Sequence, residues 1–354
     1  MSGLVDSLKK TSTRFSSKML GRTILLPSVL RTNYESQAAD YSMVIRLLQD
    51  IENNGVVLVD DTNCIRASLL QDIPKWPPKF RKKAEVVLKS LKKKNRFVEV
   101  SLKEEVTATC KNKPCQKCIR IAKIYSPAAI LASQDCIECA KAQLKAVSSV
   151  EVVDVAEYCL SDFFESHLKL SDRTLNKGEW KQDKFEQEIL IPLFRDAKHI
   201  KIYDRWIGRS VSNQRNPGQI SDNYKLTIEW IIDVFLQKSR WGVDGIFEVY
   251  SGLDTRNNKA NVPTFVTELR KFECDIKQSL PNFKLTIKEE TKTNQMPHER
   301  YLITNQVAVS IDRGFDLLLD NRKIPHPRRV RDVTVAYCSE PGKIEQAVRS
   351  MPDL

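Results

Sequence analysis

Apolar and polar positions in the first half of the chain follow helical and strand-like periods in turn. In residues 40–55 the apolar side chains recur at helical spacing, and Asn53-Asn54-Gly55 marks the end of the predicted helix. The apolar run 56–59 follows and predicts a short buried strand. Residues 129–134 and 150–155 predict two further strands. Helices alternating with strands in this way are typical of a parallel sheet.

The second half alternates in the same manner and predicts a second α/β sheet. A polar stretch without sustained periodicity, residues 166–185, precedes it and is interpreted as a linker. The alternation implies a mainly parallel sheet that helices cover on both faces. The predicted helices span residues 186–194, 226–236 and 264–280, and the predicted strands span residues 199–204, 246–250, 283–287 and 332–337.

These patterns and the length of 354 residues predict two α/β domains. Residues 1–35 contain Ser, Thr, Lys and Arg but no long apolar run, and we interpret them as a flexible basic arm. The N-terminal α/β domain is expected at residues 36–165. The C-terminal α/β sandwich is expected at residues 186–354, after the linker.

Composition narrows the class of protein. A hydrophobic fraction of 41% and a charged fraction of 29% are ordinary for a globular chain. No apolar run is long enough to span a membrane, and the N-terminus does not resemble a secretory signal, so we expect a soluble, cytoplasmic protein. The formal net charge of +12 favours an acidic partner, namely nucleic acid, anionic lipid or another phosphate-bearing molecule.

A basic segment lies between the predicted strands of the first half. Pro77-Pro78 begins it, and residues 79–94 place apolar side chains on one helical face and lysines over the rest. Glu85 is the only acidic residue in that segment. A run of charge is often just a solvated face, but the near absence of acids favours a phosphate-facing surface that includes Lys82 and Lys83.

Cysteine spacing gives the most specific local signal in this half. The chain has nine cysteines, and four of them form the pattern C-x2-C-x17-C-x2-C. This spacing fits a tetrahedral structural zinc site in which each C-x2-C pair approaches the ion from a tight turn. An iron–sulfur cluster uses the same ligands and stays open, as do unconnected buried thiols. The predicted ligands are Cys115, Cys118, Cys136 and Cys139, with Cys110 as a substitute.

Acidic residues follow two of the predicted strands in the first half. The string VLVDDTNCI ends one strand in Asp60 and Asp61, and Asp135 ends another. The string resembles the opening of PIN-like nucleases, in which the first strand ends in an Asp-Thr-Asn triplet. That resemblance implies that these carboxylates bind Mg²⁺ or Mn²⁺ and that the ion activates water for phosphodiester cleavage. A capping or turn role for Asp60 and Asp61 is the alternative.

The segment HERYLITNQVAVSIDRGFD predicts a hairpin in the second half. Alternating apolar residues on either side of Thr304-Asn305-Gln306 indicate two short strands joined by a polar turn. Side chains two positions apart on a strand point to the same side. We therefore expect His298 and Arg300 to share one face.

His298, Arg300 and Asn305 have the spacing H-x-R-x4-N, which resembles the H-x-K-x4-D motif of the phospholipase D superfamily. The resemblance implies a histidine nucleophile and a phosphate held by the basic residue. Arg300 replaces the lysine and keeps the phosphate-binding role, because its guanidinium suits phosphate. Asn305 replaces the aspartate and cannot ionise. No second copy of the motif occurs among the four histidines, so catalysis would require a homodimer.

The second half resembles more closely the phospholipase-D-like domain that follows MIT domains. The matching residues are His298-Glu299-Arg300, Asn305 and Arg313-Gly314-Phe315-Asp316. The segment from Tyr203 to Ile207 resembles the opening of such domains. The resemblance implies a non-enzymatic domain that binds phosphorylated ligands or membrane surfaces, with Arg313 beside Arg300.

Three functions compete at this point. The first is a nucleic-acid-directed nuclease or effector, suited to a prokaryotic defence or toxin-like system. The second is a non-enzymatic, zinc-stabilised adaptor that binds nucleic acid or another phosphate-bearing ligand. The third, a membrane-surface adaptor, ranks last because the chain lacks an amphipathic membrane helix with exposed Trp or Phe.

Overall fold

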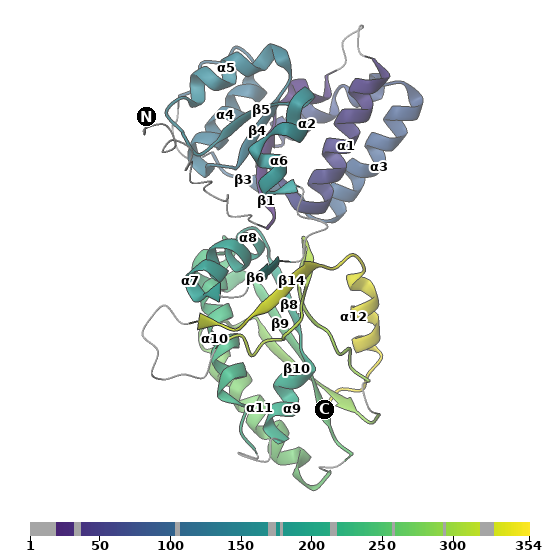
Figure 1. Ribbon diagram of the computed structural model, residues 1–354, viewed down its shortest axis with the longest axis vertical. Coiled ribbons are helices and arrows are strands. Elements are labelled where there is room, and N and C mark those ends of the chain that lie inside the picture. The colour runs from purple at the N-terminus through teal and green to yellow at the C-terminus, as the bar shows by residue number, and fades with distance from the viewer. Residues whose placement is uncertain are drawn as a thin grey trace, which may run out of the picture.

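The molecule has two halves, each built around a β-sheet (Figure 1). The N-terminal half occupies one end of the long axis and the C-terminal half the other. None of the helices in the part of the chain described here is long and apolar enough to cross a membrane. The computed structural model describes residues 19–31, 37–102, 107–168, 175–177, 180–212, 218–256, 259–292, 295–318 and 329–354.

The N-terminal sheet is parallel throughout, with the strand order β3-β2-β1-β4-β5. Every residue of its second strand is buried, because helices cover both faces of the sheet. Its strands are β1 (Gly21–Leu25), β2 (Gly55–Asp60), β3 (Phe97–Val100), β4 (Ala129–Ala132) and β5 (Glu151–Asp154).

Five helices connect these strands, and a short sixth follows the last of them. The helices α1 and α3 lie side by side, and α4 packs against α5 as a second pair. Right-handed crossovers put the two pairs on opposite faces, because the chain builds outward from β1 first in one direction and then in the other. The helices are α1 (Ala38–Asn54), α2 (Cys64–Leu70), α3 (Pro78–Lys93), α4 (Lys113–Tyr125), α5 (Gln134–Leu144) and α6 (Asp162–Ser166).

The strand β1 corrects the prediction of a flexible arm over residues 1–35. It is the central strand of the sheet, and Ile24 and Leu25 are fully buried. A 3₁₀ turn, η1 (Pro27–Leu30), follows it. The apolar run in this segment is short and has no alternation, so periodicity gave no strand signal there. Residues 1–18 and 32–35 of the predicted arm lie outside the described residues.

The C-terminal sheet has seven strands in the order β10-β9-β8-β11-β12-β14-β6. Only the pairs β10–β9 and β9–β8 are parallel. The other four pairs, including β8–β11, are antiparallel. The expectation of a mainly parallel sheet was therefore wrong, because the hairpin and the last strands return without crossover helices. The strands are β6 (Leu175–Lys177), β8 (His199–Tyr203), β9 (Ile246–Asp254), β10 (Phe283–Glu290), β11 (Arg300–Thr304), β12 (Ala308–Ile311) and β14 (Val333–Tyr337).

Helices cover both faces of this sheet. One face packs in a large core with α10 and α11, and the other packs with α12 around Tyr203 and Ile344. A two-stranded sheet pairs β7 (Trp180–Lys181) with β13 (Arg329–Val330). The helices are α7 (Gln182–Phe185), the π-helical turn η5 (Glu186–Leu190), α8 (Ile191–Phe194), α9 (Arg205–Arg209), α10 (Asp222–Lys238), α11 (Val262–Lys277) and α12 (Pro341–Arg349).

The predicted linker, residues 166–185, contributes to the C-terminal half. The strand β6 extends the large sheet at its edge, and the side chain of Trp180 is buried. These short elements escape a periodicity analysis, since two or three residues define no period. The boundary between the halves therefore lies nearer to residue 168 than to residue 185.

Polar contacts join the two halves. Arg22 on β1 donates two hydrogen bonds to Asp196, which follows α8, at 2.8 and 2.6 Å. At a second point Asn95 donates to the carbonyl of Asn305 at 3.2 Å, and Gln306 donates to the carbonyl of Asn95 at 2.9 Å. The turn of the C-terminal hairpin is thus part of the junction.

Candidate functional site

Asp60 ends β2 and is fully buried at the carboxyl edge of the N-terminal sheet. Its carboxylate accepts hydrogen bonds from the backbone amides of Cys64 and Ile65, at 3.1 and 2.7 Å, at the start of α2. The Lys117 ammonium on α4 donates at 2.7 Å, and the Thr62 hydroxyl donates as well. Both oxygens of Asp60 are therefore occupied by groups of the protein itself.

These contacts fix the charge of Asp60. Burial by itself would raise the pKa of this carboxyl group, but the hydrogen bonds from Lys117 and Thr62 and from the two amides outweigh burial and lower the pKa to about 2. The carboxylate is ionised and anchors the start of α2 to α4. This arrangement matches the capping or turn role that the sequence left as the alternative.

The other predicted acids are exposed. Asp61 follows Asp60, and its backbone amide bonds to the carbonyl of Val100 on β3. Asp135 lies in the first turn of α5, after β4. The central strand β1 separates β2 from β4, so about 10 Å of sheet lies between the two strand ends. The structure does not join these acids through a hydrogen bond or a shared partner.

The described residues contain no group of three or more His, Cys, Asp or Glu side chains arranged to hold a metal ion. The strand that ends in Asp60 is also the second of its sheet, whereas the PIN-like resemblance concerns a first strand. The metal-dependent nuclease stays a prediction.

A small crevice lies where the N-terminal sheet changes direction, between β1 and β4. Its volume is about 250 Å³, and Ser28, Ser133 and Asp154 line it together with Tyr41 and Trp76. Parallel sheets bind ligands at such a switch point. Sequence reasoning missed these residues, because it did not predict β1.

The cysteines of the C-x2-C pairs lie on helices α4 and α5 rather than in tight turns. A spacing of three also places two residues on one helical face, so the spacing alone does not distinguish a helix from a tight turn. The thiol of Cys118 is buried and donates to the carbonyl of Leu25 at 3.8 Å, whereas Cys139 is exposed beside Gln143. As they stand, the four predicted ligands do not form a tetrahedral set.

Three thiols come close to one another at the start of α4. Burial, together with the neighbouring Cys110 and Cys136, raises the pKa of Cys115 to about 12. Cys110 is the substitute ligand considered from the sequence. The zinc prediction itself stays a prediction.

The basic helix was predicted correctly as α3, with Ala84, Val87 and Leu91 buried. Lys82 and Lys83 are exposed on it. In Figure 1 this helix lies in the N-terminal half, far along the long axis from α9. Lys82 and Lys83 therefore do not belong to one site with Arg300.

The predicted hairpin forms, since β11 pairs with β12 in antiparallel register. His298 precedes β11, however, and its side chain is exposed, so the expectation that strand geometry aligns it with Arg300 was wrong. Asn305 lies at the opposite end of β11 from Arg300. Its side-chain oxygen accepts from the amides of Lys198 and His199 at 2.9 and 3.3 Å. The three residues of the motif do not converge.

Arg300 instead meets a buried acid at the carboxyl edge of β8. Asp204 follows that strand, caps α9 through the Trp206 amide at 2.8 Å, and accepts from the Phe315 amide at 2.8 Å. The Nε atom of Arg300 lies 4.0 Å from Asp204. Burial raises the pKa of Asp204 to about 6, although the two amides and Arg300 oppose that rise.

Glycine permits this approach. Gly314 has a φ of +91°, and a Cβ there would lie 2.8 Å from the Asp204 carboxylate and 3.0 Å from Nε of Arg300. Any other residue would push the loop away from both groups. The segment Arg313-Gly314-Phe315-Asp316 thus has a physical role beside Arg300, while the half-exposed Arg313 lies 4.0 Å from Asp316.

Two more arginines surround a second buried acid at the same edge. Glu290 ends β10 and is fully buried; Arg209 contacts it, and Arg205 lies 3.9 Å away. The Nε atoms of Arg209 and Arg300 are buried and have no hydrogen-bond partner in the described residues. Both can therefore donate to a ligand.

Positive charge exceeds negative charge at this edge. Burial and the nearby Arg205 and Arg256 together lower the pKa of Arg209 to about 10, although Asp254 opposes this decrease. Burial and then Arg300 lower the pKa of Arg205 in the same way. Like charges this close destabilise one another unless an anion joins them. Four arginines, namely Arg205, Arg209, Arg256 and Arg300, face three acids, Asp204, Asp254 and Glu290.

An exposed aromatic ring lies beside the arginines. Trp206, the second residue of α9, keeps 37% of its surface exposed. The guanidinium groups of Arg205 and Arg209 lie 5.4 and 5.5 Å from the centre of its ring. An exposed ring flanked by cations can stack on a nucleobase.

Sequence reasoning found Arg300 and Arg313 but missed the rest of this cluster. The available signal was an acid directly after or at the end of three consecutive parallel strands, at Asp204, Asp254 and Glu290. Because ligands of α/β sheets bind beyond the carboxyl ends of the strands, these three acids mark a candidate site in the second half as well.

The chain matches no protein-family model. The search of curated proteins likewise gives no match.

Proposed function

We propose that the C-terminal half binds the phosphates of single-stranded nucleic acid at the carboxyl edge of its sheet and does not cleave them. The arginine cluster carries the proposal. Arg209 and Arg300 have buried Nε donors without partners, and the local excess of arginine over acid calls for an anion.

Phosphate suits this cluster better than a carboxylate does. Two guanidinium groups from different elements, α9 and β11, provide forked donors for a tetrahedral anion with several oxygens. Mutual repulsion between the arginines falls when an anion binds, so binding recovers free energy stored in the unbound protein.

Trp206 favours nucleic acid over an isolated phosphate group. Proteins that bind single strands combine basic side chains for the backbone with exposed rings for the bases. The net charge of +12 adds long-range attraction to a polyanion. An adaptor of this kind was the second of the functions considered from the sequence.

Binding is favoured over hydrolysis by the positions of His298 and Asn305. His298 is exposed ahead of β11, and the amide side chain of Asn305 bonds to the backbone at the far end of that strand. Among the described residues no hydrogen bond orients the imidazole, and a nucleophile requires a base or an orienting partner.

The test is fluorescence anisotropy of a labelled 12-nucleotide single strand, in DNA and RNA form, at fixed salt. Arg300→Gln should weaken binding about tenfold to a hundredfold, because it removes a charge-assisted contact. Trp206→Ala should cost about 1–3 kcal/mol, the usual effect of losing one stacked base. The oligonucleotide should keep its full length during the titration.

Lys343→Gln is the matched control. It removes one positive charge from the exposed surface of α12, where Lys343 pairs only with Glu340. If Lys343→Gln and Arg300→Gln weaken binding equally, net charge alone explains the affinity and the cluster is not the site.

A further inference from the structure

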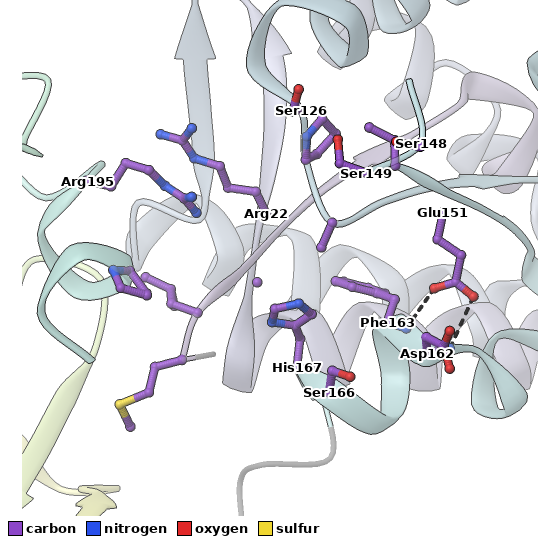
Figure 2. Close-up of a pocket in the computed structure, with 17 residues that line it drawn as sticks. Arg22, Ser126, Ser148, Ser149, Glu151, Asp162, Phe163, Ser166, His167 and Arg195 are labelled. Carbon is purple, nitrogen blue, oxygen red and sulfur yellow. Dashed lines mark hydrogen bonds between the residues drawn. The ribbon is translucent and has the colours of Figure 1, made fainter. Parts of the chain in front are cut away.

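A cavity lies between the two halves (Figure 2). Its volume is about 660 Å³. It opens at the amino edge of the N-terminal sheet, beside Gly21 at the start of β1 and Glu151 at the start of β5. Pro192 and Arg195 line it from the C-terminal half. The cavity is thus distinct from the carboxyl edge where the arginine cluster lies.

One end of the cavity is basic. Figure 2 shows the guanidinium groups of Arg22 and Arg195 near each other. Both pair with a single acid, Asp196: Arg22 through hydrogen bonds of 2.8 and 2.6 Å, and Arg195 with its Nε atom at 3.6 Å. The Nε atom of Arg195 is buried and makes no hydrogen bond in the described residues. Two cations share one carboxylate, so one positive charge is uncompensated there.

Apolar side chains such as Leu20, Val150 and Phe163 line part of the cavity, and polar groups line the rest. Ser126, Ser148 and Ser149 present hydroxyl groups along one side in Figure 2. At the far end the carboxylate of Glu151 accepts from the backbone amides of Asp162 and Phe163, at 3.1 and 2.7 Å. Each of its oxygens has capacity for a further donor. The two ends of the cavity therefore have opposite preferences.

We propose that this cavity binds a nucleotide-like phosphate monoester, with its phosphate at Arg22 and Arg195 and its hydrogen-bond donors toward Glu151. The positive charge of Arg22 and Arg195 that Asp196 leaves uncompensated selects an anion. The volume is that of a pocket for a small organic molecule and far exceeds what a phosphate ion alone would fill. Serine hydroxyls suit the ribose, and the aromatic ring of Phe163 lines the same wall.

Such a ligand would contact both halves at once. Arg22 belongs to β1, whereas Arg195 and Asp196 follow α8. Binding would therefore stabilise the arrangement in which the two halves are joined, and a ligand of higher affinity would stabilise it more. This site is independent of the proposed nucleic-acid site, because the two share no residue.

Calorimetric titration of the full chain with AMP, ribose 5-phosphate and adenosine tests the proposal. AMP and ribose 5-phosphate should bind and adenosine should not, since adenosine lacks the phosphate. Arg195→Gln should weaken AMP binding about tenfold to a hundredfold. Ser149→Trp offers a second variant, because this residue is exposed and its bulk would obstruct the cavity without disturbing a core. It should weaken binding at least as much.

Arg300→Gln separates this site from the carboxyl edge. AMP affinity should be unchanged in Arg300→Gln, while oligonucleotide affinity should be unchanged in Arg195→Gln. The proposal is overturned if AMP does not bind at millimolar concentration, if Arg195→Gln and Ser149→Trp bind it as tightly as the wild type, or if Arg300→Gln abolishes its binding.

Discussion

The two sheets end in carboxyl edges that carry opposite chemistry. At the N-terminal edge a single buried acid, Asp60, receives hydrogen bonds at both oxygens and pairs with Lys117. At the C-terminal edge four arginines face three acids, and the buried Nε atoms of Arg209 and Arg300 make no hydrogen bond within the described residues. The polar groups of the first edge are saturated by the protein, whereas the second edge is the one proposed to bind an anion.

The contrast separates a structural charge from a binding site. Both edges occupy the position where α/β proteins bind ligands, so topology alone does not distinguish them. The two edges differ in whether their buried polar groups have hydrogen-bond partners within the protein. A carboxylate whose pKa is lowered by partners stabilises the fold, while arginines whose pKa values are lowered by burial and by one another favour ligand binding.

The largest effect is expected from Asp60→Ala. The substitution removes the carboxylate that pairs with the Lys117 ammonium. It also leaves two backbone amides at the start of α2 without their hydrogen-bond acceptor. Removing one partner of a buried pair costs about 3–5 kcal/mol in free energy of unfolding. Urea denaturation measures this loss.

Asp61→Ala is the control for that measurement, because Asp61 is exposed and bonds only through its backbone amide. It should change stability by less than about 0.5 kcal/mol. If Asp60→Ala were equally mild but abolished a metal-dependent cleavage of nucleic acid, Asp60 would be a catalytic ligand and the contrast between the edges would fail.

Periodicity predicted the long elements of both halves. The helices α1, α3, α10 and α11 carry apolar side chains at helical spacing and lie close to their predicted bounds. The strand β1 was missed, because a short apolar run without flanking alternation resembles many other segments. Its central place follows from pairing with β2 and β4, which are distant in sequence.

The arginine cluster was only partly predictable for a related reason. Arg205 and Arg209 come from α9, Glu290 from the end of β10, and Arg300 from the start of β11. Their meeting depends on the strand order β10-β9-β8-β11. A local motif such as H-x-R-x4-N identifies Arg300 but gives no information on strand order, and it grouped Arg300 with the distant Asn305.

A smaller effect concerns pH, and the two edges should respond in opposite directions. Asp204 has a pKa raised to about 6 in the folded protein, so its stabilising contribution exists below about pH 4 and is lost as the pH rises through 6. Asp60 has a lowered pKa, so its contribution exists above about pH 4 and is lost as the pH falls toward 2. Protonation of Asp204 removes a negative charge beside Arg300.

Oligonucleotide affinity should therefore rise as the pH falls from 7 to 5, by up to about tenfold, or about 1.4 kcal/mol. Phosphodiesters do not titrate in this range. Arg205, Asp316 and Tyr224 also lie near Asp204, and burial raises the pKa of Asp316 as well. Asp204→Asn should lose this part of the pH dependence. Curves of equal slope for the wild type and Asp204→Asn would assign the effect to other groups.

The smallest effect is expected from Cys139→Ser, and it tests what holds the N-terminal edge together. Hydrogen bonds inside the domain connect the elements at this edge. Lys117 on α4 donates to Asp60, and Cys118 on α4 donates to the carbonyl of Leu25 on β1. Cys139 is exposed on α5. Its replacement should change the free energy of unfolding by less than about 0.5 kcal/mol and leave the metal content, measured by mass spectrometry, unchanged. A site of four thiolates predicts the reverse, since losing one ligand of a structural zinc ion costs much of the folding free energy that the ion supplies. Released zinc together with a lower melting temperature in Cys139→Ser would mean that a metal, and not the Asp60 network alone, fixes this edge.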